Sequence, residues 1–184
     1  MHIKKILTYD VYAETTGTDR YKRVCNLLNQ IIDPDTLKPD SIECNEKHVL
    51  ISSRKRALSC TKKDSASSIS VSPELNEIAF PLQEFCSEED FLKGGSTAVR
   101  EAFVQAFIKD KLETSHKKLQ LELRNIVTLS KQMEQTLCIS HTFRMKLLEI
   151  YANIGDDLFQ NPTIIKEHID CKKHLYDFGE IIEI

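Results

Sequence analysis

A long stretch of helical periodicity constrains this chain more than any other feature. After Gly94-Gly95, apolar residues recur mostly three, four or seven positions apart, which is the spacing of one face of an α-helix. The members of this pattern are Val99, Phe103, Phe107, Leu112, Leu119, Leu123, Ile126, Met133 and Leu137. Only one of the five prolines follows the two glycines, so little in this half of the chain interrupts a helix. We therefore predict long helices here, with a bend or break at Thr114-Ser115-His116.

The second half of the chain also contains shorter predicted helices. One covers about 140–159. Another begins at Asn161-Pro162, a cap followed by proline at the first helical position, and continues through Ile165, Ile169 and Tyr176. Ser87-Glu88-Glu89-Asp90 forms a capping box ahead of a short helix that ends at the two glycines. The region 87–184 is therefore predicted to be an antiparallel bundle of three to four helices.

The first half of the chain has shorter elements. Alternating apolar residues from Ile3 to Val11 predict a half-buried strand, and the run after Thr16 predicts one helix that stops at Asp33-Pro34. Further short strands are predicted at Val49-Leu50-Ile51, Ile69/Val71 and Ile78/Phe80/Leu82. We expect an α+β protein that is predominantly α. A small module of short strands and one helix, residues 1–86, would pack on the helical bundle, residues 87–184.

Composition limits the kinds of partner. The formal net charge is −3, which does not favour a nucleic acid ligand. The basic run Arg54-Lys55-Arg56 with Lys62-Lys63 has no interleaved aromatic residues for base stacking, so we interpret it as a solvated loop. No apolar run reaches the roughly 20 residues that span a bilayer. Six dispersed cysteines are typical of free thiols. These features predict a cytoplasmic protein without a membrane span.

Two pairs of cysteine and histidine are candidates for a zinc site. Cys138 and His141 are three residues apart, as are Cys171 and His174, so each pair would share one face of a helix. Neighbouring antiparallel helices could then bring all four together as a Cys2His2 site. The alternative is that the cysteines are core residues and the histidines lie at the solvent edge, which the flanking Lys172-Lys173 favours. We predict no metal and no cofactor, and keep these four residues as the candidates.

One segment resembles a known family. Asp33-Pro34-Asp35-Thr36-Leu37 stands where the U-box has a Pro-Ile-Thr-like turn. The other matching positions are Ile42, His48 before an apolar run, Arg54 ahead of Ala57-Leu58, and Ser72-Pro73-Glu74-Leu75. The stretch at about 32–85 is thus similar to the U-box of ubiquitin ligases, which implies binding of a ubiquitin-conjugating enzyme. The Asp-Pro-Val segment is missing, the His-to-Arg gap is wider and no Gly precedes the His, so no family residue is carried over as a site.

Apolar residues on more than one side of the predicted helix at 96–137 indicate a partner surface. They are Val104, Ile108, Leu121, Val127 and Leu129. One helix of a small bundle buries only part of its circumference, so the surplus marks a partner site or self-association. The alternative is a central helix that the rest of the chain wraps. No nucleophile elbow, phosphate-binding glycine loop or H-E-x-x-H motif occurs.

These observations predict a non-catalytic adaptor that binds another protein. The composition, rich in Lys, Ile, Leu, Glu and Ser with no Trp, is compatible with an effector that a host-associated bacterium delivers into its host. A ubiquitin-ligase-like activity of the segment at about 32–85 is the alternative function.

Overall fold

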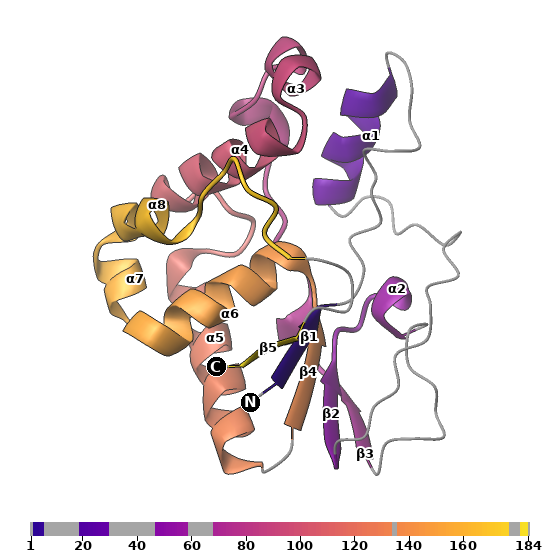
Figure 1. Ribbon diagram of the computed structural model, residues 1–184, viewed down its shortest axis with the longest axis vertical. Coiled ribbons are helices and arrows are strands. Elements are labelled where there is room, and N and C mark those ends of the chain that lie inside the picture. The colour runs from indigo at the N-terminus through magenta and orange to yellow at the C-terminus, as the bar shows by residue number, and fades with distance from the viewer. Residues whose placement is uncertain are drawn as a thin grey trace.

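A mixed β-sheet with helices packed beside it forms the described part of the chain (Figure 1). The computed structural model describes residues 2–5, 19–29, 47–58, 68–133, 136–176 and 181–183. The strands are β1 His2–Lys5, β2 His48–Ile51, β3 Ser68–Val71, β4 Thr136–Ser140 and β5 Ile181–Glu183. The helices are α1 Asp19–Leu28, α2 Lys55–Leu58, α3 Glu88–Gly94, α4 Ser96–Ile108, α5 His116–Gln132, α6 Thr142–Ile154, α7 Asp157–Gln160 and α8 Ile165–His168. Short 3-10 turns are η1 Pro73–Leu75, η2 Leu82–Glu84 and η3 Pro162–Ile164.

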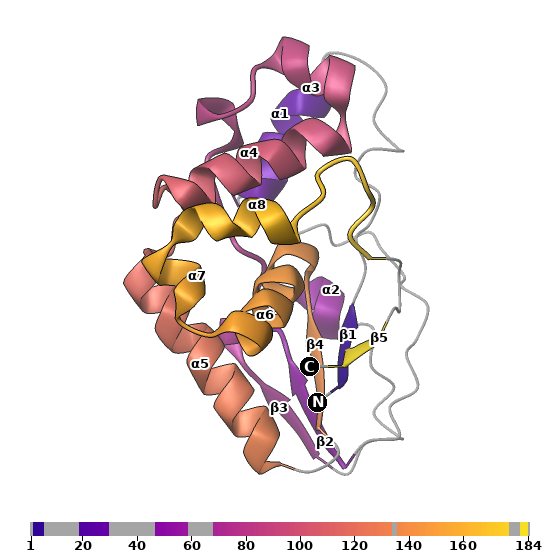
Figure 2. The same ribbon diagram turned by 60° about the vertical axis from the view of Figure 1, so that its left-hand side comes forward.

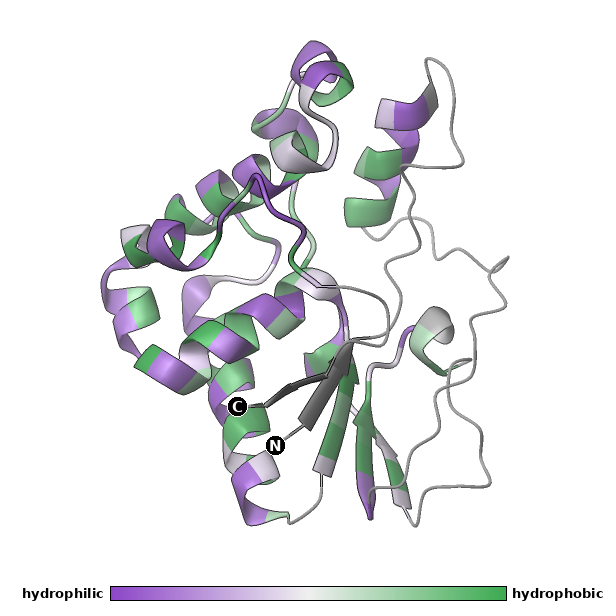
Figure 3. Cartoon of the chain, viewed as in Figure 1, coloured by the Kyte–Doolittle hydropathy of each residue, from purple (hydrophilic) through white to green (hydrophobic). Residues whose placement is uncertain are grey.

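The sheet has the strand order β3-β2-β4-β1-β5, and β4 lies at its centre. β4 pairs in parallel with β2 and β1, β2 pairs in parallel with β3, and β5 runs antiparallel to β1. All five residues of β4 are buried, and Figure 3 shows hydrophobic residues along both β2 and β4. Continuous burial is typical of parallel strands, because connecting helices cover both faces of such a sheet.

The fold class predicted from sequence is wrong. β2 and β3 come from the first half of the chain and β4 from the second, yet hydrogen bonds join them in one sheet. The architecture is therefore α/β with a largely parallel sheet, and not an antiparallel helical bundle packed on a small module. The predicted domain boundary between residues 86 and 87 stays a prediction.

Three local predictions also fail. The helical periodicity was extended through Leu137, but Thr136–Ser140 is the central strand. The strand predicted at Ile78/Phe80/Leu82 is extended backbone followed by η2, outside the sheet. The last helix ends at His168 and does not continue towards Tyr176. Most of the first strand and the stretch 33–46 lie outside the described residues.

Other local predictions are confirmed. α4 and α5 are separated by 109–115, which contains two residues of the predicted break. Ser87 caps α3, and its Oγ accepts a hydrogen bond from the Asp90 backbone N–H at 3.1 Å. Gly95 has φ +53°, which an L side chain rarely adopts, so glycine permits the sharp turn between α3 and α4.

An aromatic core fixes the helices against the segment that follows η1. Phe103 of α4 stacks on Phe143 of α6 with ring centroids 4.0 Å apart, and Phe80 meets both rings edge-on. Full burial of a phenylalanine contributes roughly 1.5–3 kcal/mol. Because Phe143 is the second residue of α6, this core holds the first turn of α6 close to the end of β4 (Figure 2).

Candidate functional site

A buried polar cluster lies where β2 and β4 end. Ser52 follows the last residue of β2 and His141 follows the last residue of β4. Ser52 Oγ and His141 Nε2 are 2.9 Å apart, although 89 residues separate them in sequence. Both residues are buried, with exposed fractions of 0% and 2%. The parallel sheet therefore brings together two polar side chains that the sequence keeps far apart.

Asn76 completes the hydrogen bonding of this pair. Ser52 Oγ donates to Asn76 Oδ1 at 2.7 Å and accepts from the Arg54 backbone N–H at 3.2 Å. Asn76 also binds the neighbouring Ser53 through the backbone N–H and the hydroxyl. Since the Ser52 proton is directed at Asn76, the geometry assigns a proton to Nε2 of His141, which donates to Ser52. The Ser52 hydroxyl is fully engaged, so His141 is the reactive candidate in this pair.

The first turn of α6 lies directly after His141 and is held by Glu77. The Glu77 carboxylate accepts hydrogen bonds from the backbone N–H groups of Phe143 at 3.4 Å and Arg144 at 3.2 Å. The N-terminus of a helix carries a partial positive charge, which stabilises a carboxylate there. The Thr142 hydroxyl oxygen in the same turn is buried and has no hydrogen-bond partner among the described residues.

The two arginines beside the cluster differ in whether a carboxylate of the described residues forms an ion pair with them. Arg144 Nη1 pairs with Glu122 Oε2 at 2.9 Å, so this cation is neutralised inside the protein. Arg54 is half-buried, and within the described ranges no carboxylate forms an ion pair with it. Arg54 follows Ser52 by two residues, so a cation without an ion pair among the described residues lies at the rim of the cluster. This rim favours a ligand with negative charge.

The four zinc candidates lie on different elements. Cys138 is in the middle of β4 and His141 follows its end, while Cys171 and His174 lie in the segment after α8. In a strand, side chains three positions apart point to opposite faces, so the helical geometry assumed for Cys138 and His141 does not apply. Across the part of the chain that the structure describes, no three His, Cys, Asp or Glu residues are grouped to hold a metal ion.

The predicted partner surface is mostly enclosed. Val104 and Val127 are buried, with exposed fractions of 4% and 9%, and Ile108 packs against the core. Leu121 and Leu129 are exposed at 49% and 42%. Two separate leucines on α5 are ordinary for a protein surface. The surplus of apolar area on which the adaptor was argued is therefore small, and self-association stays a prediction.

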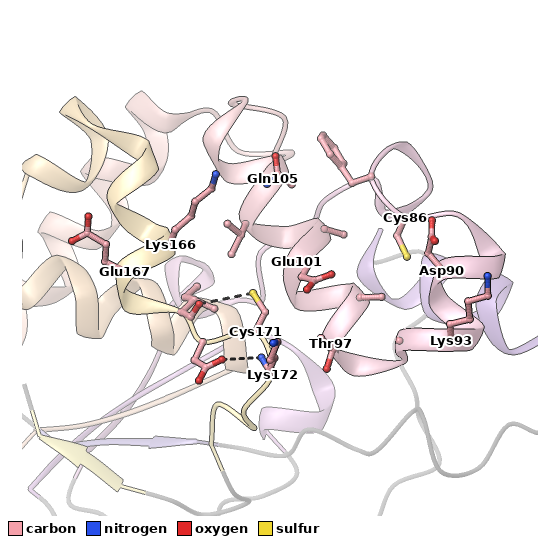
Figure 4. Close-up of a pocket in the computed structure, with 17 residues that line it drawn as sticks. Cys86, Asp90, Lys93, Thr97, Glu101, Gln105, Lys166, Glu167, Cys171 and Lys172 are labelled. Carbon is pink, nitrogen blue, oxygen red and sulfur yellow. Dashed lines mark hydrogen bonds between the residues drawn. The ribbon is translucent and has the colours of Figure 1, made fainter.

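A hollow in the surface lies between α4 and the chain around α8, away from the polar cluster (Figure 4). It is an open groove with a volume of about 930 Å³. Charged side chains of both signs line it, including Glu101, Lys166 and Asp170, with Cys86 and Cys171. The buried Arg100 supports one wall by donating from Nε to the Cys171 carbonyl oxygen at 2.8 Å. Glu101, Lys166 and Asp170 are exposed to solvent.

Comparisons with known proteins give a limited result. No family model matches the chain, and no curated protein matches it. A solved crystal structure from Escherichia coli K-12, described as a "putative alpha-ribazole-5'-P phosphatase", is similar over 84% of this chain and 80% of its own. The two sequences are 19% identical and the TM-score is 0.40.

The predicted function is corrected by these findings. The adaptor and effector prediction is wrong, because residues 87–184 do not form the helical bundle that would present the groove: Thr136–Ser140 is the central strand of a sheet. The ubiquitin-ligase-like alternative is also wrong, because residues 48–51 and 68–71 of the U-box-like segment are strands of the common sheet. No helix of the described residues is long and apolar enough to cross a membrane.

Sequence reasoning singled out His141 for an incorrect reason and missed Ser52, Asn76 and Glu77. A signal was present, because polar residues directly follow two apolar runs, Val49-Leu50-Ile51 and Leu137-Cys138-Ile139. In a parallel sheet, residues at such positions meet at one edge. The second run was interpreted as a helix, so this inference could not be made.

Proposed function

We propose that this protein is an enzyme that binds a phosphate monoester at the carboxyl ends of β2 and β4 and hydrolyses it. The observation that carries the proposal is the Ser52–His141 contact at that edge of the sheet. After β2 the chain continues to β3 at one edge of the sheet, whereas after β4 it continues to β5 at the opposite edge. Ligands of open α/β sheets bind at such points, outside the carboxyl ends of the strands.

The chemistry of the residues supports a phosphate ester as the ligand. Hydroxyl, amide and imidazole groups at this edge can donate hydrogen bonds to phosphoryl oxygens, and Arg54 adds positive charge. The Glu77 carboxylate is bound to α6, so its negative charge is partly offset by the helix. The exposed Ser53 and the half-buried Asn76 form the accessible side of the cluster.

In the proposed reaction, water adds across the bond between phosphorus and the ester oxygen. His141 donates a proton to the leaving alcohol oxygen and recovers one from the attacking water, so an alcohol and inorganic phosphate are released. Ser52 and Asn76 hold the imidazole in place. A histidine in this role contributes roughly 100-fold to 10,000-fold to the rate.

The test measures phosphate release by the purified full chain from p-nitrophenyl phosphate and a panel of sugar and nucleotide phosphates. His141→Ala should lower kcat by about 100-fold or more. His168→Ala is the matched control, because His168 is half-buried on α8 and outside the cluster; its kcat should equal that of the wild type. Absence of release from every ester, or equal rates for His141→Ala and the wild type, would refute the proposal.

The proposal includes a cytoplasmic location and a ligand other than nucleic acid. A cytoplasmic location is supported by the free thiols of Cys25, Cys86 and Cys171, which are typical of a reducing compartment. A ligand other than nucleic acid is supported by the net charge of −3.

A further inference from the structure

A buried arginine connects the polar cluster to two helices. The Arg144 side chain is 4% exposed, and it reaches from α6 to two partners. Its Nη1 donates to Glu122 Oε2 of α5 at 2.9 Å, and its Nε donates to the backbone carbonyl oxygen of Asn76 at 3.0 Å. The Arg144 backbone N–H also donates to Glu77. Arg144 therefore binds the segment 76–77 with both its backbone and its side chain.

Asn76 is held from two directions. Arg144 binds its carbonyl oxygen, while its side-chain amide binds Ser52 and Ser53. A continuous series of hydrogen bonds thus runs from Glu122 through Arg144 and Asn76 to Ser52, and from Ser52 to His141. A rotation of the Asn76 peptide would move Oδ1, which accepts the Ser52 proton. A shift of the Arg144 guanidinium would therefore also shift the His141 imidazole.

Stability alone does not account for a charged pair at this position. Burial lowers the pKa of Arg144, and the charge of Glu122 opposes this effect. Taking both ions out of water offsets much of their attraction, so apolar residues of similar volume often stabilise a protein equally well. What the guanidinium adds is direction, because its planar donors fix the partner oxygens at set angles.

We propose that Arg144 is a positioning residue for His141: its bonds to Glu122 and Asn76 fix Ser52, and Ser52 fixes the imidazole. This inference rests on the proposed function, since it concerns the same site. Under this proposal, α5 and α6 determine the position of the His141 imidazole, although the ligand need not touch either helix.

The experiment compares Arg144→Lys with a matched control, Arg124→Lys. Arg124 of α5 is likewise one half of a guanidinium–carboxylate pair, with Nη2 2.6 Å from Asp156 Oδ2. Unlike Arg144, it is exposed and lies outside the cluster. The lysine variants keep the charge and remove the fork of donors. Glu122→Gln is the second variant, because it keeps a hydrogen-bond acceptor if Arg144→Lys does not fold.

The first readout needs no activity. The titration of the His141 ring is followed by NMR of histidine-labelled protein, and Arg144→Lys should shift its midpoint by about one unit, whereas Arg124→Lys should leave it unchanged. The second readout is kcat, which should fall by about 10-fold or more with KM little changed, since a misplacement of about 1 Å can reduce a rate by about 100-fold.

The outcomes separate the two proposals. If the wild type releases no phosphate but Arg144→Lys shifts the His141 titration, the proposed function fails and the positioning role stands. If Arg144→Lys and Glu122→Gln lower only Tm and leave both the titration and kcat at the values of Arg124→Lys, Arg144 has a structural role and the inference is overturned.

Discussion

The polar cluster at the end of β4 and the groove beside α4 differ in almost every respect. The groove has a volume of about 930 Å³ and is lined by charged side chains of both signs. In the cluster, by contrast, Ser52 and His141 are buried, and hydrogen bonds join Ser52 to Asn76 at 2.7 Å and to His141 at 2.9 Å.

The comparison teaches that fixed geometry distinguishes the two regions. Desolvation of polar groups is unfavourable unless each group finds a partner, so a buried polar cluster persists only when the fold positions its members. Solvated charges of a groove need no such support. Two experiments would break or sharpen this contrast, and a third measures an exposed ion pair outside both regions; they follow in order of decreasing effect.

The largest effect is expected in the chemistry of the cysteines. Cys138 is fully buried in β4 beside the cluster, and burial raises its pKa to about 12. Cys171 lies in the groove and is partly exposed, although burial also raises its pKa. Since the thiolate is the reactive form, iodoacetamide at pH 8 should modify Cys171 at least about 100-fold faster than Cys138. Peptide mapping by mass spectrometry measures the two rates separately. Equal rates would show that the region of β4 opens as readily as the groove.

A smaller effect is expected on stability. Asn76→Ala removes the acceptor of the buried Ser52 hydroxyl, which should lower the free energy of unfolding by about 1–3 kcal/mol. Lys166→Ala in the groove changes an exposed side chain and should stay within about 0.5 kcal/mol of the wild type. Urea denaturation measures both values. A loss for Asn76→Ala no greater than that for Lys166→Ala would contradict the idea of a fixed cluster.

The smallest effect concerns an exposed ion pair that is neither in the cluster nor in the groove. Hydrogen bonds from Arg124, followed by those of Gln120 and Tyr151, lower the pKa of Asp156 from 3.8 to about 2. Its contribution to stability is therefore complete above about pH 4 and is lost as the pH falls towards 2. Asp156→Asn should show a smaller fall in Tm between these pH values than the wild type.

The neighbouring Asp157→Asn serves as the control for this measurement, because Asp157 is exposed and its carboxylate forms no ion pair within the described residues. This substitution should leave the acid dependence of Tm unchanged. An identical acid profile for Asp156→Asn and the wild type would mean that the exposed pair contributes nothing measurable, as many surface pairs do.

Local signals predicted much of the secondary structure. The capping box at Ser87, the helices α4 and α6, and the strand at Val49-Leu50-Ile51 follow from caps and periodicity within a few neighbouring residues. Contacts between residues that are close in sequence define these elements, so one amino-acid sequence is enough to predict them.

The central strand could not be recognised in this way. Thr136–Ser140 is buried on both faces, so it lacks the alternation that marks a half-buried strand, and Leu137 continued the spacing of the preceding helix. Its neighbours β2 and β1 are remote in sequence, and no local pattern encodes that pairing. The candidate site depends on this pairing, because it forms only when β2 and β4 end side by side.

The place of β1 in the sheet has a consequence for how the chain acquires its structure. His2 pairs with Leu137 on one side and with Glu183 on the other. A growing chain therefore carries β1 through the synthesis of everything up to β4 before either neighbour emerges from the ribosome. Such distant pairings slow folding, so nascent chains of this protein should depend on chaperones for longer than those of a helical protein of equal size.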